Sequence, residues 1–155
     1  MVVVLALSTG ARRGELLSLR WADVDLKRGM LTFRQTKNGE TRAVPLAGYA
    51  LELLTQHAKR RRLDTTLVFP DKTGTRPLGI RDAFEGAVKR AGITNFHFHD
   101  LRHDFASNLA KNSASLLEIA EVLGHKTLQM TKRYAHLSEA HTAGVVARMN
   151  RAIFG

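Results

Sequence analysis

Apolar residues recur at helical spacing in several short segments of this chain, and this repetition limits its fold more than any other feature. Residues 80–91 keep the i, i+3, i+4, i+7 pattern of one helix face until a glycine ends it. Residues 116–123 repeat the pattern after Ser115, which forms a capping box with Glu118, and Gly124 closes that segment. A chain divided in this way is predicted to be mainly helical.

The other segments add further helices and a small sheet. Helical spacing predicts one helix that begins at Val2 and others at 12–20, at 47–62, at 97–112, from about 128, and at 138–153. "MLTFR" and "TRAVPL" alternate like strands around "KNGE", where Asn38 and Gly39 are typical of a hairpin turn. "TLVFP" at 66–70 is expected to be a third strand, and residues 23–25 a capped turn. The expected fold class is α+β, mainly helical, with a small three-stranded antiparallel sheet.

The charge of the chain indicates a polyanionic partner. Its 155 residues include 24 Lys and Arg against 14 Asp and Glu, which gives a net charge of +10 before histidine is counted. Such a surplus attracts phosphate backbones through counterion release, so a nucleic acid is favoured. Solubility or an anionic membrane surface would also account for the charge.

Length and cysteine content limit the class of protein further. A chain of this size with 44% hydrophobic residues is expected to form one compact domain. Because it has no cysteine, disulfides, thiolate metal sites and thiol nucleophiles are excluded, and a cytoplasmic setting fits. The apolar run in "MVVVLALSTG" is too short to span a bilayer, so no membrane partner is expected. The first helix begins at Val2 without a cap, so the chain is expected to be a piece of something longer.

Several polar residues stand where they could meet a phosphate. His99 and Arg102 are three residues apart near a helix start, so they share one face. Arg12 follows a glycine turn and enters a helix, where backbone N–H groups and a guanidinium can bind an anion together. Lys37 lies beside the predicted hairpin tip. His125 and Tyr134 come from two further segments.

Convergence of these groups on a DNA phosphodiester would give a metal-free cleavage reaction. Two arginines would hold the non-bridging oxygens, and a lysine or histidine would protonate the departing 5′ oxygen. The phenol of Tyr134 would attack phosphorus and form a 3′-phosphotyrosine. Ionising a phenol with a pKa near 10 costs about 4 kcal/mol at pH 7, and nearby cations and a histidine are expected to reduce that cost.

Four segments together resemble a known family. "TGARRGE", "TKNGETRAVPL", "HDLRHDFAS" and "LGHKTLQMTKRYAH", in this order and spacing, are similar to the catalytic domain of the tyrosine recombinases, the phage integrase and Xer family. The resemblance covers nearly the whole chain. It implies site-specific recombination or integration without metal or other cofactor, in a bacterial or phage-encoded protein of the cytoplasm.

The resemblance also implies a role for each matching residue. The implied catalytic residues are Arg12, Lys37 as general acid, His99, Arg102, His125 and Tyr134 as nucleophile. The implied supporting residues are Glu15, which braces an arginine, and His103. The implied DNA contacts are Arg13, Lys126, Lys132 and Arg133.

The expected partners are double-stranded DNA and other copies of the recombinase, monomeric when free and tetrameric in a synapse on DNA. Residues 1–155 are expected to be the C-terminal catalytic domain, with the family's core-binding domain absent. The family's last segment often docks onto a neighbouring protomer, so the helix after His136 is expected either to do this or to fold back in cis.

Two other functions and a metal site are alternatives to this interpretation. A type IB topoisomerase shares the chemistry but does not synapse two sites, and a non-catalytic basic module would use the same residues only to bind DNA. His97, His99 and His103 have a spacing that zinc can use. The absence of an HExxH glutamate and of thiolates, and the charge of Arg102 between the histidines, argue against that metal.

Overall fold

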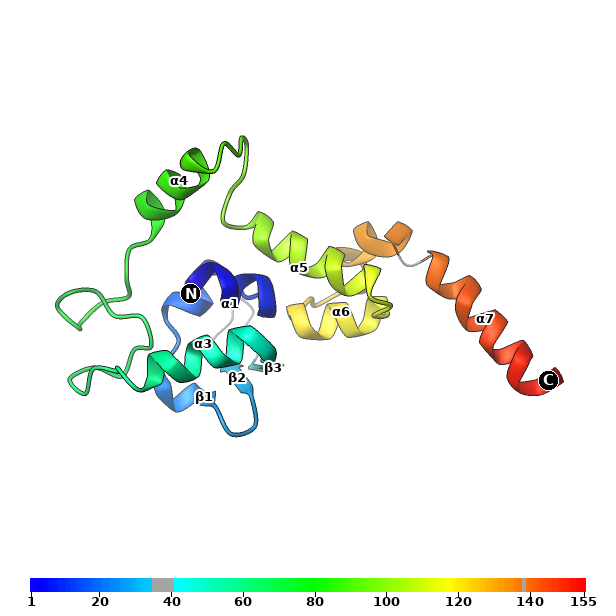
Figure 1. Ribbon diagram of the computed structural model, residues 1–155, viewed down its shortest axis with the longest axis horizontal. Helices are drawn as coiled ribbons and strands as arrows, with labels where there is room; N and C mark the ends of the chain where they lie inside the picture. Colours follow the sequence, from blue (N-terminus) through cyan, green and yellow to red (C-terminus); the bar gives the residue numbers. More distant parts are fainter. Residues whose placement is uncertain (35–40, 138) are drawn as a thin grey trace.

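The computed structural model describes residues 1–34, 41–137 and 139–155, which form helices around one small sheet (Figure 1). The α-helices are α1 (Val2–Thr9), α2 (Arg13–Leu17), α3 (Gly48–Ala58), α4 (Arg81–Arg90), α5 (Asp100–Lys111), α6 (Leu116–Leu123) and α7 (Glu139–Phe154). Short 3-10 helices are η1 (Trp21–Asp23), η2 (Leu128–Met130) and η3 (Lys132–Leu137). The predicted fold class, α+β and mainly helical, is confirmed.

The sheet is antiparallel, with strand order β1 (Val24–Asp25), β2 (Met30–Phe33) and β3 (Arg42–Pro45). Its inner face is set by alternation along β2 and β3, where every second side chain is buried. Leu31 pairs with Val44, and Phe33 pairs with Arg42. A charged residue therefore lies on the buried face of the sheet.

The prediction of the third strand was wrong. Residues 66–70 make isolated bridges, Leu67 with Arg20 and Pro70 with Pro77, and do not join the sheet. The third strand is β1 instead, so the prediction of a capped turn at 23–25 was also wrong. Val24 pairs with Leu31, and Asp25 Oδ1 accepts a hydrogen bond from the Arg28 backbone N–H at 2.9 Å, which moves the turn beyond Asp25. The predicted hairpin turn at Asn38 and Gly39 lies outside the described residues.

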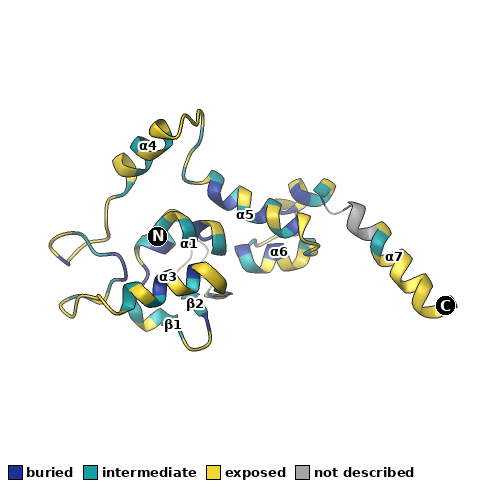
Figure 2. Cartoon of the chain, in the orientation of Figure 1, coloured by how far each residue is buried: buried dark blue, intermediate teal, exposed yellow. Residues whose placement is uncertain are grey.

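The core of the described residues has two parts. The larger part joins α1, α2, the sheet and α3, and its buried members include Leu5, Leu16, Leu31 and Leu54. The smaller part lies between α5, α6 and η3 and includes Ile119, Leu123 and Tyr134. Figure 2 colours buried residues dark blue, and the described part of α7 is mostly yellow, that is, exposed. The first helix is thus a core helix, as predicted.

Glycines bring the predicted site segments close together. Gly10 ends α1 with φ 61°, and a Cβ there would lie 2.4 Å from Phe105 Cδ1 on α5. Only glycine allows both the left-handed turn and this close approach of α5. Gly124 ends α6 with φ 65° in the same way. The two turns present Arg12 and His125 beside α5.

The two outer helices differ from the core helices. The apolar stripe of α4 is only partly buried. Phe84 packs against Phe98 with the two ring centroids 5.2 Å apart. Helix α7 projects away from α5 and α6 (Figure 1) and exposes apolar side chains, namely Val145, Val146, Met149, Ile153 and Phe154. In the described part of the chain, no helix has the length and apolar character needed to cross a bilayer.

Candidate active site

Glu15 lies at the centre of an ion-pair network. Its carboxylate accepts hydrogen bonds from the Arg12 backbone N–H at 2.7 Å and from Arg12 Nη1 at 2.8 Å. Arg42 approaches from β3 and donates through Nη1 and Nη2 to the two oxygens, at 3.0 and 2.8 Å. Burial raises the pKa of Glu15, but the hydrogen bonds and charges of Arg42 and Arg12 outweigh it and lower this pKa to about 2.

Arg102 is buried where three helices meet. Its Nη1 donates to the Gly10 carbonyl at 2.6 Å and its Nη2 to the Leu123 carbonyl at 2.7 Å, so one guanidinium joins the ends of α1 and α6 to α5. Both carbonyls lie at helix C-termini, where the dipole favours a cation. Burial, together with the charges of Arg12 and Arg42, lowers the pKa of Arg102 to about 10, so it is still charged at neutral pH.

His99 stands at the start of α5, exposed at the surface but partly desolvated by its neighbours, and close to the same charges. Its ring lies edge-on to His103, with ring centroids 5.0 Å apart. Burial lowers the pKa of His99, and the charges of His103, Arg102 and Arg12 lower it further. The ring is therefore neutral at pH 7 and can donate or accept a hydrogen bond.

His125 is fixed by the turn that ends α6. Its backbone N–H donates to the Ala120 carbonyl at 2.9 Å, and its Nδ1 lies 2.8 Å from the hydroxyl of the buried Thr131. Burial lowers the pKa of His125 to about 4, with further contributions from the arginines Arg102, Arg12, Arg133 and Arg42. The ring is therefore neutral at pH 7.

Tyr134 lies on η3 with only 5% of its surface exposed. Its hydroxyl is 2.7 Å from Nδ1 of His103 on α5. Burial raises the pKa of Tyr134 above 10 and outweighs the opposite effects of Arg133 and Arg102. Cationic neighbours thus favour ionisation of this phenol, as expected, but in the protein without DNA burial opposes it more strongly.

The structure brings most of the predicted site residues into one neighbourhood. The charges of Arg12 and Arg102 both lower the pKa of His99 and the pKa of His125, and the charge of Arg102 also favours ionisation of Tyr134. Lys37 lies outside the described residues. The predicted DNA contacts are all exposed on segments that adjoin the site: Arg13 on α2, Lys126 after His125, and Lys132 and Arg133 on η3.

Two further residues at the site were missed by the sequence reasoning. Thr131 is fully buried against His125, and only its spacing of three residues before Tyr134 could have marked it. Arg42 offered a clearer signal. The alternation in "TRAVPL" places it on the same face as Val44 and Leu46, and an arginine on a core-facing strand position needs a buried partner.

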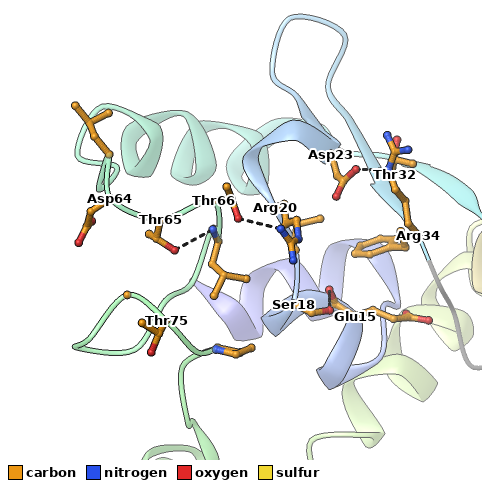
Figure 3. A pocket seen from close by; sticks show the side chains of 16 residues that line it. Glu15, Ser18, Arg20, Asp23, Thr32, Arg34, Asp64, Thr65, Thr66 and Thr75 are labelled. Atoms are coloured by element: carbon orange, nitrogen blue, oxygen red, sulfur yellow. Dashed lines mark hydrogen bonds and ion pairs between the residues drawn. The ribbon is translucent and has the colours of Figure 1, made fainter.

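Two pockets adjoin parts of this cluster. One, of about 850 Å³, lies beside Glu15 and is lined by polar side chains such as Ser18, Arg20 and Thr66 (Figure 3). None of Arg102, His125 and Tyr134 lines it. A smaller pocket of about 390 Å³ contains His103, Tyr134 and Arg133.

Within residues 1–34, 41–137 and 139–155, no three histidine or acidic side chains are placed to hold a metal ion. The side chain of His97 is 83% exposed, and its backbone N–H donates to Asp100.

The chain is similar in sequence and in structure to known recombinases and integrases. The model of the phage integrase family matches residues 1–141. The shufflon-specific DNA recombinase of Escherichia coli is 37% identical over 137 residues, which are 86% of this chain and 33% of that protein. The solved catalytic domain of bacteriophage HP1 integrase has a TM-score of 0.71 and 32% identity, and the match covers 94% of this chain and 79% of that one. XerH site-specific recombinase, solved bound to palindromic difH substrate, has a TM-score of 0.74 and 26% identity, over 94% of this chain and 44% of that one.

These findings define the class of protein first. A helical fold with a three-stranded antiparallel sheet is that of the tyrosine recombinase catalytic domains. The chain belongs to the phage integrase family. It spans about a third of the length of the Escherichia coli relative and less than half of the XerH chain.

Proposed function

We propose that this chain is the catalytic domain of a longer recombinase, and that it cleaves and rejoins DNA strands through a 3′-phosphotyrosine in site-specific recombination or integration. The observation that supports this most is that Arg102, whose guanidinium joins the ends of α1 and α6 to α5, lies close enough to both His125 and Tyr134 to change their pKa values, while Arg12 acts on His125 in the same way. Relatives from a bacterium and a phage support the same reaction by their names. We place it on DNA in the bacterial cytoplasm.

Two arginines would hold the scissile phosphate. A guanidinium has five N–H donors. Arg102 gives Nη1 and Nη2 to carbonyls and Arg12 gives Nη1 to Glu15, so each keeps further N–H groups for non-bridging oxygens. His99 and His125 would add hydrogen bonds from neutral rings. These charges neutralise the phosphate as its negative charge grows in the transition state.

Tyr134 would supply the nucleophile. Its oxygen attacks phosphorus, its proton passes to Nδ1 of His103, and the bond from phosphorus to the 5′ oxygen breaks. We propose that Lys37 donates the proton that the departing 5′ oxygen needs. One phosphorus–oxygen ester bond replaces another, and the phosphate remains a diester. The reverse attack by a 5′ hydroxyl therefore rejoins DNA without ATP.

The surface around the site would bind the DNA backbone. Arg13, Lys126, Lys132 and Arg133 are exposed on segments next to the proposed active site. Because their side chains are exposed, each can approach a phosphate. Their contribution to binding is expected to fall with added salt, as counterion release requires.

Relaxation of DNA by a topoisomerase-like mechanism is less well supported. It would use the same chemistry, but the relatives bear the names of recombinases and integrases. The two activities differ in one measurable way, because a recombinase joins strands from two sites whereas a topoisomerase changes the linking number of one DNA. A non-catalytic DNA-binding module would yield neither product.

Recombination would also require other protomers. We propose that free copies are monomeric and that they assemble as tetramers on DNA. The exposed apolar side chains of α7, which projects away from α5 and α6 (Figure 1), support docking of this helix onto a neighbouring protomer rather than in cis.

A suicide substrate tests the proposal directly. DNA with a nick beside the cleavage site should trap a covalent protein–DNA adduct with the wild type, while Tyr134→Phe should bind the same DNA and form no adduct. EDTA should leave adduct formation unchanged, because guanidinium groups neutralise the charge. An adduct formed by Tyr134→Phe would overturn the assignment of the nucleophile.

A further inference from the structure

Arg42 is a buried arginine that touches two predicted site segments without being part of either. Only 9% of its surface is exposed. Nη1 and Nη2 donate hydrogen bonds to the two carboxylate oxygens of Glu15. Nε donates to the carbonyl of Val122, in the last turn of α6, at 3.0 Å. The guanidinium carbon also lies 4.9 Å from the centroid of the Phe33 ring, its cross-strand partner. All three nitrogens are thus engaged within the protein.

The surroundings of Arg42 are shaped to hold its side chain in this one position. A Cβ at Gly124 would lie 3.1 Å from Arg42 Cδ, so the turn before His125 leaves room for the arginine stem. The pairing of Phe33 with Arg42 fixes the backbone on the other side. A planar fork that meets both oxygens of a carboxylate cannot be reproduced by an ammonium group.

We propose that Arg42 is a positioning residue, which sets the Arg12 guanidinium and the His125 ring relative to each other. It acts on Arg12 through the shared Glu15 carboxylate, and on His125 through Val122 and Gly124. This inference rests on the proposed function, since Arg12 and His125 matter as phosphate ligands. Arg42 itself does not contact DNA, because its donors are already used and its side chain is enclosed.

The charges around Glu15 indicate what removing Arg42 would change. Arg12, at the N-cap of α2, and Arg42, on β3, hydrogen-bond this carboxylate, and its charge also acts on Arg102 of α5. Two of its hydrogen bonds come from Arg42 and two from Arg12. Without Arg42, a mostly buried carboxylate keeps only the Arg12 donors, so Arg12 would be drawn toward it and away from the phosphate. The pKa of Glu15 would then rise.

The first test compares Arg42→Lys, which keeps the charge, with the wild type and with Arg81→Met. Arg81 is a matched control because it pairs with a carboxylate, Glu85, on the exposed face of α4. Arg42→Lys should slow single-turnover cleavage of the suicide substrate by about 10- to 100-fold, the size expected from misplaced catalytic groups. Its affinity for the DNA should stay within about twofold. Arg81→Met should match the wild type in both measurements.

A double-mutant cycle separates positioning from general destabilisation. In a Glu15→Gln background, Arg42→Lys should slow cleavage by only about twofold further, because the two residues act as one unit. An undiminished effect in that background would overturn the proposal. So would cleavage by Arg42→Lys at the wild-type rate.

A second readout does not depend on DNA cleavage. Carbon-13 NMR titration of the Glu15 carboxyl group should show a higher pKa in Arg42→Lys than in the wild type, and the His125 ring resonances should move although the charge is kept. Unchanged resonances for both groups would overturn the proposal. If the wild type formed no adduct while these shifts were seen, the proposed function would fail and the coupling by Arg42 would stand.

Discussion

The contact between Tyr134 and His103 decides how the proposed nucleophile loses its proton. Burial raises the pKa of the phenol, so arginines alone do not activate it in the free protein. Burial also lowers the pKa of His103, so its ring is neutral at pH 7 and can accept a proton at Nδ1 when Nε2 bears the hydrogen. Base catalysis of this kind commonly contributes about 10²- to 10⁴-fold to a rate.

We expect His103→Phe to lower the single-turnover cleavage rate by about 100-fold with little change in DNA affinity. The wild-type rate should be level above the pKa of His103 and fall as acid protonates the ring. The variant should instead gain rate steadily as pH rises, because its phenol depends on solvent to take the proton. Measuring both pH profiles checks this, with His97→Phe as a control on an exposed histidine. Parallel profiles for wild type and His103→Phe would contradict the assignment.

His125 should make the stability of the fold depend on pH. Its pKa in the folded protein is lowered from 6.5 to about 4, so folding favours the neutral ring. The stability that this contributes is complete above pH 6.5 and is lost as the pH falls from 6.5 to 4. Because the ring is partly solvated, we expect a loss of about 1–2 kcal/mol rather than the full value of the shift.

Denaturant unfolding at pH 7 and pH 4 of the wild type and of His125→Asn measures this contribution as a difference. His99 and His103 also have lowered pKa values, but they titrate in both proteins. Their contribution to the pH dependence of stability therefore cancels in the difference. Equal pH dependence in the two proteins would show that His125 is not held neutral by the fold.

At the scale of elements, the helix ends show where local sequence is at odds with local structure. Helices α4, α5 and α6 all end with the same pair of backbone hydrogen bonds. The residue that adopts the left-handed conformation after the helix is Gly92 for α4, Ser113 for α5 and Gly124 for α6. Ser113 adopts φ 72°, a conformation that costs a residue with a Cβ about 1–2 kcal/mol. Two of the three ends therefore have the residue that their geometry favours.

Replacing Ser113 with glycine should stabilise the protein by about 0.5–1 kcal/mol, since relief of the left-handed strain exceeds the added freedom of the unfolded chain. Thermal and denaturant unfolding measure the gain. Gly124→Ala is the opposite substitution at a matching position and should destabilise, both through its φ of 65° and through contact with Arg42 Cδ. A loss of stability in Ser113→Gly would mean that the serine makes a contact worth more than its strain.

Elements with strong local signals could be predicted from the sequence, and those that depend on distant pairing could not. The helices with periodic apolar faces and glycine stops, such as residues 81–90 and 116–123, occur where they were predicted. The strand at Val24 consists of two residues and is fixed only by its pairing with Leu31, so no local pattern reveals it. "TLVFP" has strand-forming residues, but Leu67 makes only an isolated bridge with Arg20, and the segment does not join the sheet.

At the scale of the whole molecule, contacts between distant segments build the site. Arg102 joins a carbonyl 92 residues earlier to one 21 residues later, and Arg42 reaches Val122 across 80 residues. Motifs could nominate Arg12, Arg102 and Tyr134 because each lies in a recognisable segment. They did not nominate Arg42, although it lies in "TKNGETRAVPL", because its contacts depend on which segments the fold places on either side of it. The same fold leaves α7 with an apolar face that no local signal assigns to a partner.

The apolar face of α7 should therefore matter to assembly and not to folding. We expect the double substitution Val146→Asp and Met149→Asp to change stability by less than about 0.5 kcal/mol, because both side chains are about half exposed in the free protein. Cleavage of a single suicide site should persist, whereas strand exchange between two sites should fall by at least about tenfold, since charges would be buried at the contact between protomers. Native gels of the protein–DNA complexes and a two-site exchange assay measure the two effects. Val145→Asp and Ile153→Asp test neighbouring positions of the helix, and normal exchange by all four substitutions together would show that α7 is not a docking element.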